Sequence, residues 1–237
     1  MTDPVPERRE FADGAELAPA FAAWTAEALR AAVEARGMAL IVVSGGSTPK
    51  RYFQALSAES LDWARIAVTL ADERRVPDDS PRSNARLVRE TLLVGPAARA
   101  QFAPLADSRL PPAQELAAAG ARVARLPLPA DLVVLGMGDD GHTASWFPHA
   151  AGLAEAMDPA ARSLVAPIVP PDGLEPRLTL TGRVILRARK LALQIEGAGK
   201  LATLARAMED GPAEDMPIRT VLRLAADRLT IFSAASS

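Results

Sequence analysis

A loop near the middle of the chain places a histidine beside two aspartates. Residues 136–142 read Gly-Met-Gly-Asp-Asp-Gly-His and directly follow the apolar run 132–135. A histidine can accept a proton from water near neutral pH, and a neighbouring carboxylate can fix its tautomer and stabilise the imidazolium that forms. The loop therefore predicts general-base chemistry at His142, with Asp140 as the preferred partner and Asp139 as the alternative. A loop histidine whose hydrogen bonds serve only the structure would show the same sequence pattern.

The same loop admits two further interpretations. Residues 136–141 match the Gly-x-Gly-x-x-Gly fingerprint of dinucleotide sites, but two aspartates would repel a pyrophosphate, and Pro148 leaves little room for the long helix that such folds require. Two aspartates and a histidine could also ligate a cation, although a hydrated loop explains them equally well. The dinucleotide interpretation is therefore disfavoured, and a metal site is only weakly supported.

A second glycine loop, Ser44-Gly-Gly-Ser-Thr-Pro, follows the apolar segment 38–43. Thr48 and Pro49 occupy the places of a helix N-cap and a first helical residue. Glycines let backbone N–H groups approach an anion, hydroxyls add donors, and a helix N-terminus favours negative charge. The pattern is typical of a phosphate site, but it is not a Walker A motif, and a plain strand-to-helix turn remains an alternative.

Two more features bear on the chemistry. Asp72, Glu73 and Arg74 follow the apolar segment 65–71, where they would either serve a site or form a solvated loop. No serine lies in a Gly-x-Ser-x-Gly elbow, and the chain has no cysteine. Direct attack by water is therefore favoured over a covalent intermediate.

Alternating strands and helices must position these loops. Apolar segments predict strands at 38–43, 65–71, 132–135, 163–169, 177–181, 190–195 and 228–232. Helical spacing predicts helices at 16–36, with Asp13 and Gly37 as caps, after the N-cap Ser83, at 112–126, after Thr181, and from Leu201. The alternation indicates an α/β fold, a single doubly wound, mainly parallel sheet with helices on both faces (Rossmann-like), and one domain spanning 1–237. The loops at Ser44, Asp72, Gly138 and Gly197 would then share one edge of the sheet.

Composition limits the partners. The 237 residues are 49% hydrophobic, and 27 basic residues nearly balance 29 acidic ones, which does not indicate a nucleic-acid groove or a membrane surface. The N-terminus lacks the apolar region of a signal peptide, and no later apolar run reaches membrane-spanning length. We expect a cytoplasmic protein, and the sequence indicates no particular oligomeric state.

Five motifs in sequence order resemble the glucosamine-6-phosphate isomerase/6-phosphogluconolactonase family, and within it the lactonases. They are residues 44–49, residues 72–77 with Ser83 and Asn84 downstream, residues 135–145, residues 177–181, and residues 197–200. The resemblance spans most of the chain. It implies hydrolysis of 6-phospho-D-glucono-1,5-lactone to 6-phospho-D-gluconate, a step of the oxidative pentose phosphate pathway, without an organic cofactor.

The resemblance also implies roles for individual residues. His142 would activate water, and Arg74 would face the substrate or the oxyanion. Apart from the resemblance, Asp72 is a third carboxylate, besides Asp139 and Asp140, that could orient His142. The phosphate of a small sugar lactone would lie against Ser44, Gly45, Gly46, Ser47, Thr48, Arg177 and Lys200. The related deaminases carry a glutamate five residues after the histidine, where this chain has Phe147, so a deaminase-like isomerase is the less favoured alternative. A non-catalytic sugar-phosphate sensor is the other.

Overall fold

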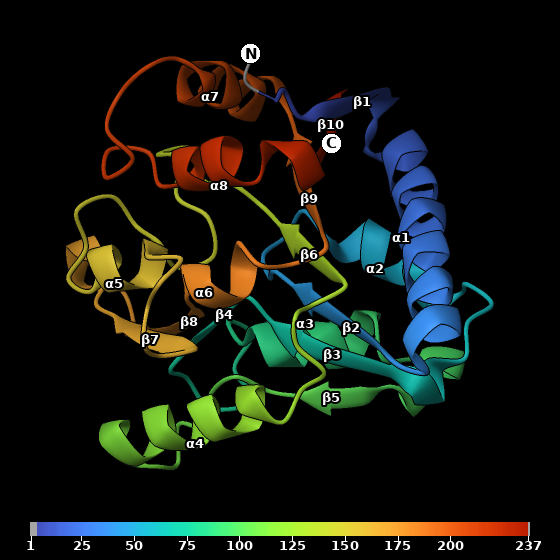
Figure 1. The fold of residues 1–237 in the computed structure, drawn as a ribbon, viewed down its shortest axis with the longest axis horizontal. Coiled ribbons are helices and arrows are strands. Elements are labelled where there is room, and N and C mark those ends of the chain that lie inside the picture. The colour runs from blue at the N-terminus through green and yellow to red at the C-terminus, as the bar shows by residue number, and fades with distance from the viewer. Residues whose placement is uncertain (1–3, 237) are drawn as a thin grey trace.

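A seven-stranded sheet forms the centre of the protein, whose computed structural model describes residues 4–236 (Figure 1). The strands are β1 (Glu7–Asp13), β2 (Ala39–Val43), β3 (Ile66–Leu70), β5 (Gln101–Ala103), β6 (Leu132–Leu135), β9 (Lys190–Glu196) and β10 (Leu229–Ser236). Their order is β1-β10-β9-β6-β2-β3-β5, and every neighbouring pair is parallel. Strands β2 and β6 are buried at every position, as expected of continuous apolar runs. The predicted mainly parallel α/β fold is confirmed.

The helices cover both faces of this sheet. They are α1 (Gly14–Arg36), α2 (Lys50–Ser57), α3 (Asn84–Thr91), α4 (Pro112–Ala124), α5 (Leu153–Met157), α6 (Gly182–Ile185), α7 (Ala198–Met208) and α8 (Ile218–Leu224), with short 3₁₀ turns at Trp63–Arg65, Gly95–Arg99, Pro171–Gly173 and Ala226–Arg228. Parallel crossovers are right-handed. The connections β1-α1-β2, β2-α2-β3 and β3-α3-β5 run along the sheet in one direction and the later ones in the other, so α1 to α3 cover one face and α4 to α8 the opposite face. Among residues 4–236, no helix is both long and apolar enough to cross a bilayer.

The two directions diverge between β2 and β6. These strands are neighbours, but the chain leaves β2 toward β3 and leaves β6 toward β9. Such a switch point opens a crevice beyond the carboxyl ends of the two strands, where ligands of open α/β sheets bind. The loop after β2 is the Ser44 glycine loop and the loop after β6 contains His142, so the topology brings both predicted loops to this crevice.

Helix ends follow the sequence in most places. The Asp13 carboxylate accepts N–H groups of α1, Gly37 ends that helix with φ 78°, and the Ser83 hydroxyl accepts the Arg86 N–H at the start of α3. The expected N-cap Thr48 is wrong, because α2 begins at Lys50 and Pro49 takes the cap position. Thr181 is the N-cap residue of α6, but its hydroxyl donates to the Ser163 carbonyl instead of capping the helix.

Two features of the sheets differ from expectation. Strands β7 (Val165–Ile168) and β8 (Arg177–Leu180) leave the main sheet and join β4 (Asp72–Arg74) in a second, antiparallel sheet of order β4-β8-β7. The sequence did not predict the two edge strands of the main sheet. Strand β1 is charged and largely exposed without apolar alternation, and β5 has only three residues. The second sheet matters for the site, because it carries Arg74 and Arg177.

Candidate active site

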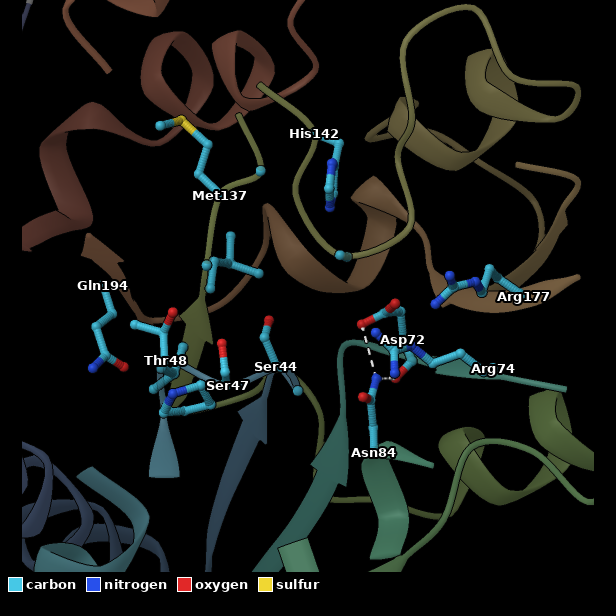
Figure 2. A pocket seen from close by; sticks show the side chains of 18 of the residues that line it. Ser44, Ser47, Thr48, Asp72, Arg74, Asn84, Met137, His142, Arg177 and Gln194 are labelled. Atoms are coloured by element: carbon cyan, nitrogen blue, oxygen red, sulfur yellow. Dashed lines mark hydrogen bonds between the residues drawn. The ribbon is translucent and has the colours of Figure 1, made fainter. Parts of the chain in front are cut away.

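A pocket of about 400 Å³ opens at the switch point, within the size range of small-molecule sites (Figure 2). Its walls include every residue that the sequence assigned to a site except Asp140. The lining residues are Ser44, Gly45, Gly46, Ser47, Thr48, Pro49, Asp72, Arg74, Arg82, Asn84, Val134, Leu135, Gly136, Met137, Gly138, His142, Ala144, Phe147, Leu174, Arg177, Gln194 and Lys200. Residues more than 150 positions apart in sequence thus share one cavity.

A tight turn after β6 presents His142 to this pocket. The Gly138 N–H donates to the His142 carbonyl at 2.9 Å, and the Gly141 N–H donates to the Gly138 carbonyl at 3.0 Å. Gly141 has φ 80°, which favours glycine. At Gly138 the reason is different, because a Cβ atom there would overlap the His142 imidazole. The ring therefore packs directly on the backbone of its own turn and projects into the pocket (Figure 2).

Asp140 fixes the orientation of that ring. Its Oδ1 lies 2.6 Å from Nδ1 of His142 and also accepts the His142 backbone N–H at 3.0 Å. This contact favours the tautomer with the proton on Nδ1, which leaves Nε2 free to accept a proton. Partial burial acts to raise the pKa of Asp140, but the hydrogen bond and charge of His142 outweigh it and hold that pKa below its usual value. Asp140 thus remains a carboxylate near neutral pH.

The other two candidate carboxylates make different contacts. Asp139 has an exposed side chain, and its backbone carbonyl accepts hydrogen bonds from Thr203 and Arg206. Asp72 is buried and accepts a 2.5 Å hydrogen bond from the Ser145 hydroxyl, while its carbonyl accepts one from the Asn84 amide at 2.9 Å. Of the three, Asp140 is the residue in contact with His142, and Asp72 is a pocket wall.

Two arginines on the small sheet make one wall electropositive. Arg74 and Arg177 are register partners on β4 and β8. Desolvation lowers the pKa of Arg177, and the positive charge of Arg74 adds to this effect. Nε of Arg74 is buried without a hydrogen-bond partner among the described residues. Paired cations with an unused donor favour an anionic ligand or a developing negative charge.

Glu73 holds this wall in place from behind. Its buried carboxylate accepts backbone N–H groups from Arg74, Asn84 and Ala85 at 2.7–2.8 Å, and the Ser83 hydroxyl at 3.2 Å. Desolvation raises the pKa of Glu73, and these hydrogen bonds only partly offset the effect. The contacts tie β4 to the start of α3, so Arg74 and Asn84 enter the pocket from one rigid unit.

Phe147 connects the base to the arginine wall. Its ring centroid lies 4.5 Å from that of His142, and the Arg177 guanidinium lies 5.6 Å from the same Phe147 centroid. Phe147 therefore supplies packing for the imidazole and a cation–π contact for Arg177.

The glycine loop and Lys200 provide donors elsewhere in the pocket. Ser44 lies centrally beneath His142, and Thr48 lies across the pocket from Arg177 (Figure 2). The Ser44 hydroxyl is buried without a partner among the described residues. Gly46 has φ 100°, which favours glycine, and a Cβ atom on Gly45 would overlap the side-chain amide of Asn84. Lys200 reaches the same pocket from the first turn of α7.

Several pocket residues were not predicted from the sequence. Gln194 is buried among apolar residues of β9 near the carboxyl end of the strand, and a polar residue at such a place is a signal that could have identified it. Arg82 and Leu174 come from irregular segments and carry no such signal. Arg82 forms an ion pair with Glu175 across the pocket rim.

Neither alternative interpretation of the His142 loop gains support. The segment after Gly141 continues as turns, and the next helix, α5, begins only at Leu153, so no helix N-terminus faces the Gly136–Gly141 positions as a dinucleotide site requires. Within residues 4–236, no group of three or more His, Cys, Asp or Glu side chains is arranged to hold a metal ion.

Fold and pocket together define a doubly wound α/β protein with an acid-oriented histidine in a crevice lined by Arg74, Arg177 and Lys200. The sequence model of the glucosamine-6-phosphate isomerases/6-phosphogluconolactonase family matches residues 12–231, and the chain belongs to this family. It is 46% identical to the 6-phosphogluconolactonase of Rhizobium meliloti (strain 1021), over 94% of this chain and 97% of that protein. It is 47% identical to the 6-phosphogluconolactonase of Pseudomonas aeruginosa, over 90% of each chain.

A solved structure shares the fold closely. The crystal structure of a 6-phosphogluconolactonase from Shewanella baltica superposes with a TM-score of 0.93 at 39% sequence identity and covers 97% of this chain and 98% of that one. The two-sheet architecture is therefore that of a solved member of the family.

Proposed function

We propose that this protein hydrolyses 6-phospho-D-glucono-1,5-lactone to 6-phospho-D-gluconate in the oxidative pentose phosphate pathway. Membership of the family and the names of its relatives support this activity. The observation that carries it is the His142 imidazole, held by Asp140 in the same pocket as the glycine loop and Lys200. We further propose that the enzyme acts in the cytoplasm, as one domain, without an organic cofactor.

His142 would act first as a base and then as an acid. Its Nε2 takes a proton from a water molecule that attacks C1 of the lactone, and a tetrahedral intermediate forms. The carboxylate of Asp140 stabilises the imidazolium. As the bond between C1 and the ring oxygen breaks, the imidazolium returns the proton to that oxygen, and the carboxylic acid product ionises in solution. The cycle consumes one water molecule and leaves His142 neutral.

Arg74 is the best-placed group to stabilise the oxyanion. The backbone N–H groups of Gly138 and Gly141 donate within their own turn and are not free for this purpose. Arg74 lines the pocket and has an unpartnered Nε. A preorganised donor toward developing charge is typically the largest single contribution to such a reaction.

The substrate phosphate would bind the donors of residues 44–48 and Lys200. Backbone N–H groups and hydroxyls of a glycine loop suit its oxygens, and Lys200 neutralises charge. Arg177 adds a second cation from the opposite wall. A phosphate bound far from C1 orients the lactone ring against His142.

A direct assay tests the proposal. Freshly generated 6-phospho-D-glucono-1,5-lactone is supplied at fixed pH, and the spontaneous opening of the δ-lactone is subtracted. We expect turnover well above this background. Binding of the sugar phosphate without turnover would instead identify a sensor, and release of ammonia from glucosamine 6-phosphate would identify a deaminase.

A further inference from the structure

Helix α7 contacts the His142 turn at the carbonyl of Asp139. The buried Thr203 hydroxyl donates to the Asp139 carbonyl at 3.3 Å. Arg206 donates to the same carbonyl at 3.4 Å and to the Thr203 hydroxyl at 3.0 Å. Asp139 immediately precedes Asp140, the residue that orients the imidazole. A change at Thr203 is therefore transmitted through one peptide unit to the Asp140–His142 pair.

The same helix carries Lys200 into the pocket. Lys200 precedes Thr203 by three positions, so both side chains lie on neighbouring parts of one helix face. The other end of the turn is held separately, because the Ile218 N–H of α8 donates to the Gly141 carbonyl at 2.9 Å and Met216 packs against Gly141. Asp140 thus lies between two held peptides, with the Asp139 carbonyl bound by α7 and the Gly141 carbonyl bound by α8.

We propose that Thr203 is a positioning residue that couples phosphate binding at Lys200 to the alignment of His142. This inference rests on the proposed lactonase function. The 3.3 Å contact is longer than the usual 2.7–2.8 Å of a hydroxyl hydrogen bond. Catalytic hydrogen bonds are often long in a free enzyme and shorten when substrate binds. A phosphate that draws Lys200 inward moves α7 against the turn, shortens this contact and fixes Asp140.

The coupling gives the substrate phosphate a role in turnover as well as in affinity. Binding energy from a remote group can be used at the reacting centre. Phosphite dianion should therefore activate hydrolysis of the unphosphorylated D-glucono-1,5-lactone, because it occupies the phosphate site and sets α7. If Thr203 only stabilised the fold, activation by phosphite would not depend on its hydroxyl group.

The test compares Thr203→Val, Thr203→Ser and the control Thr230→Val. Thr230 is also buried and bonds Glu7 from the start of β10, away from the pocket. For Thr203→Val we expect kcat on the phosphorylated lactone to fall about tenfold, with KM changed less than about twofold, as for loss of one aligning hydrogen bond. Activation by phosphite should disappear in this variant, return in Thr203→Ser, and be intact in Thr230→Val.

The outcomes separate the two proposals. Wild-type enzyme without lactonase activity would overturn the proposed function. The coupling alone would be overturned if phosphite did not increase wild-type turnover of D-glucono-1,5-lactone. It would also be overturned if phosphite still activated Thr203→Val on that substrate. A defect shared equally by Thr203→Val and Thr203→Ser would also overturn it, because the serine retains the hydroxyl.

Discussion

The imidazole of His142 rests on the α-carbon of Gly138, at a distance that leaves no room for a side chain. Gly138 also donates its N–H to the His142 carbonyl at 2.9 Å, so the two residues close one small ring of contacts. A methyl group on Gly138 would displace the ring, so glycine at this position allows the observed orientation of the proposed base.

Gly138→Ala tests this relationship. The added methyl group should push the ring away from Asp140 and lower kcat by roughly 100-fold, because displacement of a catalytic group by about 1 Å has effects of this size. Gly120→Ala is the matched control, since Gly120 lies inside α4 with no atom near its Cβ position. That control should keep full activity and gain up to about 1 kcal/mol in free energy of unfolding. Equal kcat values in the two variants would contradict the packing argument.

Asp140→Asn should remove most of the activity. An amide cannot stabilise the imidazolium and can hold the ring in the wrong tautomer, so kcat should fall by roughly 10²- to 10⁴-fold. Asp215→Asn provides the comparison, because Asp215 forms the second His–Asp pair of the chain, with exposed His149 at 3.1 Å. Steady-state kinetics should show a loss in the first variant only, and similar kcat values would remove Asp140 from the mechanism.

The depressed pKa of Asp140 predicts a pH dependence of stability. A carboxyl group with a folded-state pKa below its unfolded value of about 3.9 stabilises the fold above that pH, and loses this effect as pH falls through the folded-state pKa. The difference in free energy of unfolding between wild type and Asp140→Asn should therefore be larger near pH 5 than near pH 2.5. Urea titrations at both pH values measure it. A difference that grows on acidification would contradict the assigned direction.

Lys200→Ala should act mainly on affinity. Loss of a charge-assisted hydrogen bond of about 1.5–3 kcal/mol to phosphate predicts a KM raised by roughly 10- to 100-fold. Lys190→Ala is the control, because Lys190 is the first residue of β9, at the end of the strand away from α7. Its ammonium group lies 5.5 Å from the Trp24 ring centroid. An unchanged KM in Lys200→Ala would remove Lys200 from the phosphate site.

The parts of the fold that sequence alone could predict are those with strong local signals. Strand β6 was predicted with its observed bounds, because a continuous apolar run ends at a glycine. Strand β4 has only three residues, all of them charged, and its partner β8 lies about 100 positions later. No local sequence pattern indicates such a pairing, so the second sheet was not predicted. Strand β1 was not predicted because it is exposed and lacks apolar alternation.

The site likewise contains residues whose proximity the local sequence predicts and residues whose proximity depends on the fold. Asp140 and His142 are two positions apart, so a sharp turn brings them together and their spacing was sufficient. Arg74 and Arg177 were each singled out, but their adjacency depends on the second sheet. Thr203 lies 64 positions after Asp139 in the sequence, and the apolar periodicity of its helix indicates only which face is buried. Contacts of this kind require the fold to be known.

In the proposed mechanism the imidazole of His142 performs the chemistry while other residues bind the substrate. His142→Ala separates these roles when kcat is measured on 6-phospho-D-glucono-1,5-lactone and the Kd of 6-phospho-D-gluconate is measured by calorimetry on the same protein. We expect kcat to fall by at least about 100-fold, as for loss of a general base, with Kd changed less than about threefold. Retained turnover, or loss of binding in parallel with turnover, would contradict the account.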